Sequence, residues 1–375
     1  MKVIQLLPEL NSGGVERGTL EIGKFLNQNG HQSLVISNGG RLVEQLENEG
    51  SRHFTLPVQK KSLFSLRLVS TLRQIFEAEK PDLIHLRSRV PAWLAFLAWR
   101  KMDPATRPRL VTTVHGFYST NRYSEIMTKG EQVIAVSDSV KDYILANYPR
   151  CPEEKITVIH RGVDPAEYSP THQPDAAWRE IWQKENPHLA GKFLILLPGR
   201  ITRWKGHEDF LKIMAKVRKT YKNAHGLVAG SPHPRKMAFY DELRQKTTAA
   251  GLDDHLTYLG HRADLKNVMA ISNVVLSLST DPEAFGRVSL EALTLGKAVA
   301  AYAHGGVGEQ LDALFPAGKV ENGDWKSVAA LIQSWQKNTP HPQLNTDFTL
   351  QKMLQKTLNV YQELLAERQI TIAQR

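Results

Sequence analysis

The chain has 375 residues, more than one hydrophobic core usually organises, so its length predicts two domains. Charged residues make up 23% and apolar residues 41%, fractions that are ordinary for a soluble globular protein. The single cysteine, Cys151, excludes an internal disulfide, and no apolar run is long enough for a transmembrane helix or a signal peptide. We therefore expect a cytoplasmic protein.

In the first half, apolar strands alternate with amphipathic helices. Strands are expected at 2–7, 32–37, 82–86, 109–114 and 132–136, and helices at 15–29, 41–49, 62–79, 91–101 and 137–147. Such alternation predicts parallel βαβ units.

The pattern restarts after a polar, proline-marked stretch at 165–190. Strands are expected at 193–198, 226–229, 256–258, 274–277 and 299–302, and helices at 206–219, 234–250, 263–270, 286–295, 324–337 and 350–368. The fold class is therefore α/β, with two doubly wound, Rossmann-like domains at 1–170 and 171–350. The last segment, 351–375, is expected to be a helix that can pack back on the domain junction.

The net charge of +10 is concentrated in one part of the chain. Residues 52–122 hold 13 Lys and Arg against 4 Asp and Glu, a net +9, which leaves +1 for the rest. This concentration suggests an anionic partner: a membrane surface, a phosphorylated glycolipid or a nucleic acid. The alternative is an ordinary solvated surface.

The strongest local signal is Glu-Ala-Phe-Gly-Arg-Val-Ser-Leu-Glu at 283–291, which follows an apolar strand and opens a helix. Ligands of parallel sheets bind beyond the carboxyl ends of strands, and a helix N-terminus favours phosphate. Gly286 lets the backbone approach a ligand closely. Glu283 could reach a sugar, and Glu291 could accept both vicinal hydroxyls of a ribose. Alternatively, Glu283 only complements the helix dipole and Glu291 is a surface residue.

A second signal, Pro-Gly-Arg-Ile-Thr-Arg-Trp-Lys-Gly at 198–206, follows the strand that opens the second half. Arg200 and Lys205 lie in this loop, where two cations could neutralise a diphosphate both when it is bound and when it leaves. The alternative is a solvated basic turn.

Weaker signals follow other strands. Gly13-Gly14 permits close backbone contact with phosphate or sugar, although it lacks the G-x-G-x-x-G spacing. His115 could hydrogen-bond a sugar hydroxyl. The glycine-rich segment 305–309 could shape the floor of the same site or form a plain turn.

No metal-ligand motif, Walker loop or nucleophile elbow occurs in the sequence. We therefore expect a metal-independent diphosphate site that uses Arg200, Lys205 and helix N–H groups, with no cofactor.

Taken together, these elements resemble the retaining GT-B glycosyltransferases of the group 1, or GT4-like, family. The matching elements are Gly13-Gly14, His115-Gly116, Val136-Ser137, Arg161-Gly-Val-Asp164, the loop from Gly199-Arg200 to Lys205-Gly206, and Glu283 with Glu291 in an E-x7-E arrangement. They stand in the family's order and cover residues 3 to about 335. The resemblance implies two Rossmann-like domains facing each other across a cleft.

The resemblance also implies residue roles. Glu291 would hold the donor ribose, and Arg200 and Lys205 would bind the diphosphate. Further donor contacts would come from Gly13, Gly14, His261, Arg262, Glu283, Ala284, Phe285, Gly286 and Arg287. The catalytic set would be His115, Arg200, Lys205 and Glu283. Transfer would retain the anomeric configuration, and the departing diphosphate would help to deprotonate the acceptor. The first candidate for the donor is a UDP-hexose or UDP-HexNAc, and the second is GDP-mannose.

The acceptor is expected on the first domain, which carries the basic segment. Basic and aromatic residues together suit an anionic membrane interface, and the candidates are Arg87, Arg89, Trp93, Arg100 and Lys101. We therefore expect an anionic glycan or glycolipid acceptor, such as bacterial lipopolysaccharide core, and a possible peripheral position on the inner membrane. Alternatively, Trp93 and its helix-spaced aromatic neighbours belong to the core.

Two other functions remain open, and a third is not expected. A GT-B sugar-nucleotide epimerase would act without an acceptor, and a non-catalytic subunit would only bind the nucleotide sugar. A nucleic-acid-binding protein is not expected, because no recognised module accompanies the positive charge. A transferase should turn over the nucleotide sugar only with an acceptor. An epimerase should need none, and a non-catalytic subunit should show no turnover.

Overall fold

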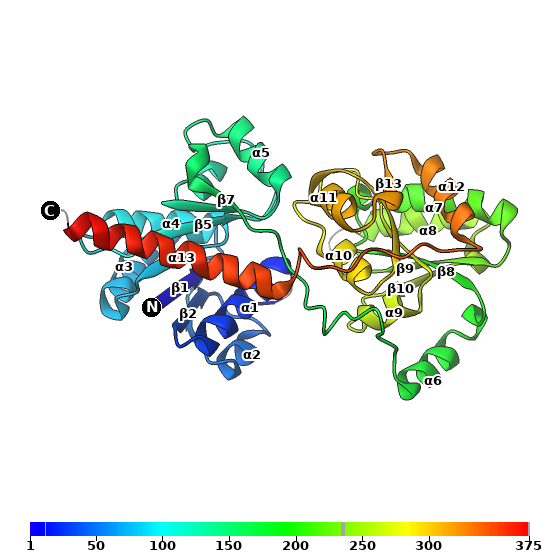
Figure 1. Ribbon diagram of the computed structural model, residues 1–375, viewed down its shortest axis with the longest axis horizontal. Helices are drawn as coiled ribbons and strands as arrows, with labels where there is room; N and C mark the ends of the chain where they lie inside the picture. Colours follow the sequence, from blue (N-terminus) through cyan, green and yellow to red (C-terminus); the bar gives the residue numbers. More distant parts are fainter. Residues whose placement is uncertain (12, 234–236, 374–375) are drawn as a thin grey trace. The chain divides into compact units, whose positions relative to one another are not determined.

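The computed structural model describes residues 1–11, 13–233 and 237–373 (Figure 1). The chain divides into two compact units: unit 1 comprises Met1–His160 with Gln351–Arg375, and unit 2 comprises Arg161–Leu350. None of the helices in the described ranges is long and apolar enough to cross a membrane.

Unit 1 is built around one parallel sheet. Its strands are β1 (Lys2–Leu6), β2 (Gln32–Ser37), β3 (Arg52–Thr55), β4 (Leu83–Leu86), β5 (Arg109–Val114), β6 (Gln132–Ala135) and β7 (Ile156–Val158), in the order β3-β2-β1-β4-β5-β6-β7. Its helices are α1 (Gly14–Gln28), α2 (Val43–Asn48), α3 (Leu68–Glu79), α4 (Arg89–Arg100), α5 (Asp138–Asn147) and α13 (Leu350–Ala373). The strand order reverses between β1 and β4, so the loops after these strands flank the switch point where doubly wound sheets bind ligands.

Unit 2 repeats the same plan. Its strands are β8 (Phe193–Pro198), β9 (Ala224–Ala229), β10 (Leu256–Gly260), β11 (Val274–Ser277), β12 (Ala298–Tyr302) and β13 (Lys319–Val320), in the order β10-β9-β8-β11-β12-β13. Its helices are α6 (Ala176–Glu185), α7 (His207–Thr220), α8 (Met237–Ala249), α9 (Leu265–Ile271), α10 (Arg287–Thr294), α11 (Gly305–Leu314) and α12 (Trp325–Trp335). The switch point lies between β8 and β11.

The central strands are fully buried. Every residue of β8, β9 and β12 is buried, as expected for parallel strands covered by helices on both faces. These near-continuous apolar runs are why the sequence predicts these strands correctly.

Several elements differ from the sequence-based expectation. The predicted helix 62–79 is divided into a 3₁₀ helix, Leu63–Arg67, and α3, and the Ser62 hydroxyl caps the start of the 3₁₀ helix by accepting from the Phe64 N–H. The polar stretch 165–190 contains α6, whose N-cap is Asp175. Strands β3 and β7 are short and partly exposed, so they carry little hydrophobic pattern. The predicted helix 234–250 is α8, and its first three predicted residues lie outside the described residues.

The C-terminal helix α13 belongs to unit 1. The hydroxyl of Tyr361 lies 2.6 Å from Nδ1 of the buried His85 in β4, and Nε2 of the same imidazole lies 2.6 Å from the Thr113 hydroxyl in β5. Near the end of the helix, Glu367 pairs with Arg109 at 3.4 Å. These contacts attach a segment from the end of the chain to the centre of the first sheet.

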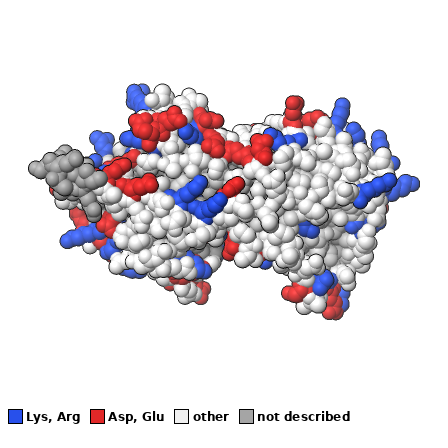
Figure 2. Space-filling model, in the orientation of Figure 1, with Lys and Arg blue, Asp and Glu red and all other residues white. Residues whose placement is uncertain are grey.

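Charges in unit 1 are interspersed rather than segregated. Figure 2 shows Lys and Arg side chains next to Asp and Glu on the face that carries α13. Three cations of the basic segment are paired: Arg52 with Glu79 at 3.1 Å, Arg73 with Glu77 at 3.3 Å, and Arg109 with Glu131 at 3.0 Å. These three cations of the basic segment are therefore neutralised within unit 1.

Candidate functional site

The site in unit 2 is built on the loops after β8 and β11, the two strands that flank the switch point. Lys205, from the first loop, lies 2.7 Å by its Nζ from Oε1 of Glu283, from the second. Their side chains are 17% and 19% exposed. The structure thus brings together two residues that the sequence places in separate motifs, at the sheet edge where ligands of such sheets bind.

Glu283 is held by a second contact that sequence analysis missed. The hydroxyl of the buried Ser279 donates to Oε1 of Glu283 at 2.5 Å. The carbonyl of Ser279 accepts from Nε2 of His304 at 2.6 Å, and this histidine follows β12. The only sequence signal for either residue is its position just after a strand.

The turn into α10 depends on Gly286. It has φ +81°, and a Cβ at this position would lie 2.3 Å from Cγ2 of Val307. The side-chain amide of the buried Gln310, in α11, donates to the carbonyls of Phe285 at 2.5 Å and Gly286 at 3.2 Å. Because this turn is locked, the first N–H groups of α10 have a fixed direction, which suits an anion. Sequence analysis missed Gln310.

Glu291 is buried inside α10. Only 6% of the residue is exposed, and its Oε1 lies 3.2 Å from Nε of Arg287, one turn earlier. The alternative interpretation as a surface residue is therefore wrong. Ala284 and Phe285 lie in the same turn between Glu283 and α10.

Arg200 differs from Lys205 in its environment. Its side chain is exposed and forms no ion pair within the ranges that the structure describes. Its carbonyl accepts a hydrogen bond at 3.2 Å from Nε2 of His207, the first residue of α7. Burial lowers the pKa of His207 to about 4, so this histidine is neutral and holds the loop as an N–H donor.

The predicted nucleobase loop, His261-Arg262, follows β10 in the same unit. His261 is exposed, whereas Arg262 donates from Nε and Nη2 to the two carboxylate oxygens of Asp264 at 2.8 and 2.5 Å. The indole of Trp178 donates to the same carboxylate at 2.7 Å. Arg262 is therefore fixed by a bidentate ion pair.

The predicted site residues of unit 1 flank its own sheet edge. Gly13 is the N-cap of α1 at φ +145°, and Gly14 is the first helical residue. His115 follows β5, and its backbone N–H donates to the Tyr118 hydroxyl at 3.1 Å.

One membrane candidate is corrected by the structure. Arg87 is 1% exposed and donates from Nη1 to Oε1 of Gln5 at 2.9 Å, so the expectation that it faces a membrane is wrong. Burial lowers its pKa to about 10. It follows β4, and the neighbouring strand β1 carries Gln5, so strand pairing places it in the interior.

The other membrane candidates are at or near the surface. Arg100 and Lys101 are exposed, and Arg89 lies over the rings of Tyr118 and Tyr123. Trp93 is half-buried and donates from its indole N–H to the Tyr123 carbonyl at 2.9 Å.

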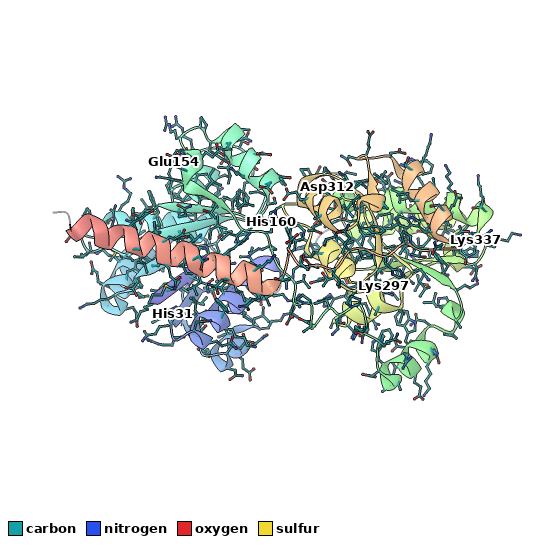
Figure 3. The ribbon with its side chains drawn as sticks, viewed as in Figure 1. His31, Glu154, His160, Lys297, Asp312 and Lys337 are labelled. Atoms are coloured by element: carbon teal, nitrogen blue, oxygen red, sulfur yellow. The ribbon has the colours of Figure 1, made fainter. Side chains whose placement is uncertain are left out.

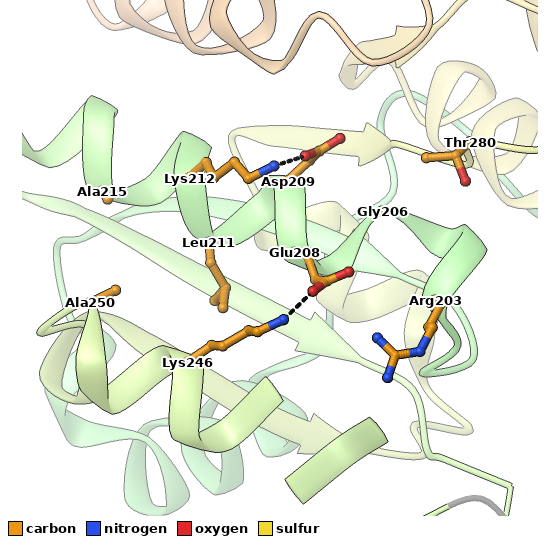
Figure 4. Close-up of a pocket in the computed structure, with 10 residues that line it drawn as sticks. All are labelled: Arg203, Gly206, Glu208, Asp209, Leu211, Lys212, Ala215, Lys246, Ala250 and Thr280. Atoms are coloured by element: carbon orange, nitrogen blue, oxygen red, sulfur yellow. Dashed lines mark hydrogen bonds and ion pairs between the residues drawn. The ribbon is translucent and has the colours of Figure 1, made fainter. Parts of the chain in front are cut away.

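A cavity of about 430 Å³ lies beside the site, between α7 and α8 (Figure 4). Its cations are already neutralised. Lys246 pairs with Glu208 and Glu242, Lys212 with Asp209 at 2.8 Å, and Arg203 with Glu242 at 2.5 Å. The cations of this cavity are therefore neutralised within unit 2, whereas the exposed Arg200 has no ion-pair partner among the described residues.

Lys297, labelled in Figure 3, lies between α10 and β12. Burial lowers the pKa of its ammonium.

Two Rossmann-like units, the second with cations, a carboxylate and a helix N-terminus at its switch point, define the GT-B class of glycosyltransferases. The family model for Glycosyltransferase Family 4 matches residues 12–167, and the model for Glycosyl transferases group 1 matches residues 179–349. The chain belongs to the group 1 glycosyltransferases and is a sugar-transferring enzyme. This membership favours transfer over the epimerase and the non-catalytic subunit.

Three known proteins show the extent of the similarity. A glycosyltransferase structure from Rickettsia africae is 30% identical, with TM-score 0.81 over 97% of this chain and 98% of that one. The structure of Anabaena HepE in complex with UDP and glucose is 22% identical, with TM-score 0.74 over 100% of both chains, and shows a common fold. The lipopolysaccharide core mannosyltransferase LpcC of Rhizobium leguminosarum bv. viciae is 30% identical over 47% of this chain and 46% of its own length.

Proposed function

We propose that the chain is a retaining, metal-independent transferase that moves a sugar from a nucleotide-diphosphate sugar to a glycan or glycolipid acceptor. The observation that carries this proposal is the convergence of Lys205, Glu283 and the N-terminus of α10 at the switch point of unit 2. A cation and oriented N–H groups suit a diphosphate, and a neighbouring carboxylate suits sugar hydroxyls.

In the proposed complex, the carboxylate of Glu291 accepts the vicinal hydroxyls of the donor ribose. Arg200, Lys205 and the first N–H groups of α10 hold the diphosphate. Glu283 holds the donor sugar, and Ser279 and His304 fix its position through the contacts described above. His261 and Arg262 lie at the nucleobase.

The proposed reaction is attack on the same face as the leaving group. The acceptor oxygen bonds to the anomeric carbon as the bond from that carbon to the phosphate oxygen breaks. The bonding electron pair stays on the diphosphate, whose oxygen takes the proton of the acceptor hydroxyl. Lys205 and Arg200 stabilise the negative charge that develops on the diphosphate, so the step needs no protein base.

A UDP-sugar is our first choice of donor, because a protein of the same fold is complexed with UDP and glucose. GDP-mannose is second, supported by the similarity of part of the chain to a mannosyltransferase. The same relative supports an anionic envelope glycan or glycolipid, such as lipopolysaccharide core, as the acceptor.

A thermal-shift screen with UDP, GDP, ADP and CMP, free and as their sugar conjugates, tests the donor site. A ligand at 100 times its Kd stabilises the native state by about 2.7 kcal/mol. We expect one nucleotide class to raise the melting temperature of the wild type, and Glu291→Gln to abolish the rise. Glu321→Gln, at an exposed glutamate of the same unit, serves as the matched control.

Donor turnover with and without a glycan acceptor then tests the reaction. Transfer that persists in EDTA and yields a product with the donor's anomeric configuration, measured by NMR, supports the proposal. A product of inverted configuration would refute the retaining mechanism. Loss of activity in EDTA that added metal restores would refute metal independence. The absence of stabilisation by any nucleotide would refute the donor site.

A further inference from the structure

The 3₁₀ helix Leu63–Arg67 displays large apolar side chains to solvent. Within the described residues, five large hydrophobic residues are exposed: Phe64 (75%), Leu66 (50%), Ile181 (56%), Met237 (43%) and Leu344 (75%). Two of the five lie in this single turn. Exposed Phe and Leu side chains forgo the free energy of apolar burial, so two of them in one turn point to a partner.

The turn is held in place by its own hydrogen bonds. The Ser62 hydroxyl accepts from the Phe64 N–H at 3.2 Å, and the hydroxyl of the buried Ser65 donates to the Lys60 carbonyl at 2.7 Å. Ser65 thereby anchors the segment on its inner side, and its neighbours on either side, Phe64 and Leu66, face outward. Their exposure is thus built into the fold.

A groove beside the turn adds apolar surface. It has a volume of about 430 Å³, and its walls come from residues of the turn and of α4. Leu66 contributes from the turn, and Trp93 and Leu97 contribute from α4. The ring of Tyr123 closes one side and carries the ammonium of Lys61 at 4.4 Å from its centroid.

The charged residues that flank this apolar turn in the sequence, apart from histidine, are all Lys or Arg. Residues 50–76 contain five Lys and Arg and no Asp or Glu. Lys60, Lys61 and Arg67 are exposed, and none has a carboxylate partner in the part of the chain that the structure describes. This distinguishes them from Arg52, Arg73 and Arg109, which are paired within unit 1.

We propose that the 60–67 segment binds an anionic lipid bilayer. Phe64 and Leu66 enter the boundary between headgroups and acyl chains, and Lys60, Lys61 and Arg67 contact the lipid phosphates. The charge decides between occupants: a second copy of the chain docked on this face would bring cations against cations, whereas a bilayer of acidic lipids complements them. The proposal extends the proposed function by naming the surface to which the enzyme docks, and it involves no residue of the donor site.

Co-sedimentation with vesicles tests the proposal. The full chain is mixed with vesicles of phosphatidylcholine alone or of phosphatidylcholine with phosphatidylglycerol. We expect binding to the anionic vesicles only, and weaker binding at higher salt. Each neutralised cation should reduce the association about fivefold, so Lys60→Gln/Lys61→Gln should lose at least tenfold. Phe64→Ser/Leu66→Ser should lose a similar factor, and Ile181→Ser/Leu344→Ser, which alters two exposed apolar residues of unit 2, should bind like the wild type.

Insertion is measured separately from adsorption. The only other cysteine, Cys151, is buried, so Phe64→Cys can be labelled selectively with an environment-sensitive fluorophore. Its emission should shift to the blue with anionic vesicles, whereas a label on Leu344→Cys should not shift.

Equal vesicle binding by Phe64→Ser/Leu66→Ser and the wild type would overturn the proposal. A concentration-dependent dimer that this variant abolishes, with no vesicle binding by either protein, would overturn it in favour of a second copy. Nucleotide thermal shifts on the same variants separate this outcome from a failure of the proposed function, because the donor site lies in unit 2 and the variants in unit 1.

Discussion

Lys205 and Glu283 form a 2.7 Å ion pair although they are 78 residues apart in the chain. The pair joins the loops after β8 and β11, whose pairing puts both loops at one edge of the sheet. Without ligand, each charge neutralises the other in a partly buried position. Binding of an anion must therefore compete with Glu283 for Lys205, which leaves the carboxylate available to other hydrogen-bond donors.

A double-mutant cycle with Lys205→Met and Glu283→Gln measures this pair. We expect a coupling free energy of about 1–3 kcal/mol in urea unfolding, because the pair is sheltered and charge-assisted. The exposed pair of Lys184 with Glu180, whose side chains are 74% and 68% exposed, is the control and should couple by less than about 0.5 kcal/mol. Equal couplings in the two pairs would contradict the role assigned to burial.

Gly286→Ala should destabilise the protein through two separable effects. The left-handed conformation costs about 1–2 kcal/mol for a residue with a Cβ, and the contact with Val307 adds about 1–3 kcal/mol. Gly251→Ala, at φ +62° with no atom within 4 Å of the added Cβ, isolates the first effect. Adding Val307→Ala to Gly286→Ala should recover only the second effect in thermal unfolding.

Acid should destabilise the protein through His207. Its folded pKa is about 4, below the value of about 6.5 in the unfolded chain, so only the unfolded state gains the proton between these values. Stability is unaffected by this group above pH 6.5, falls by about 3 kcal/mol between pH 6.5 and 4, and is constant below. His207→Gln should flatten this part of the profile in urea unfolding. Parallel profiles for the two proteins would contradict the assignment.

Arg87→Met tests whether this arginine stabilises the interior of unit 1 or contacts a membrane. The variant leaves Oε1 of Gln5 without its donor, so we expect a loss of about 1–3 kcal/mol in the free energy of unfolding. Its binding to anionic vesicles should stay within about twofold of the wild type, because the side chain is 1% exposed. Weakened vesicle binding at unchanged stability would show that this arginine reaches the lipid after all.

The periodic elements could be predicted because their signals are local. Strands such as β8 and β12 are buried apolar runs, and a loop that follows a strand identifies one edge of a parallel sheet. The candidates Arg200, Lys205, Glu283 and Glu291 could therefore be selected from residue type and position alone. The short, partly exposed strands β3 and β7 carry no such pattern, and the sequence did not reveal them.

Contacts between distant segments required the tertiary structure. Sheet order makes Lys205 a neighbour of Glu283, and it brings His304 and Gln310 from later segments to fix the loop before α10. Strand pairing placed Arg87 in the interior, and the hydrogen bonds of Ser62 and Ser65 turned Phe64 and Leu66 outward. The physical reason is that residue type determines which chemistry a side chain can perform, whereas its exposure and partners depend on segments far away in the chain.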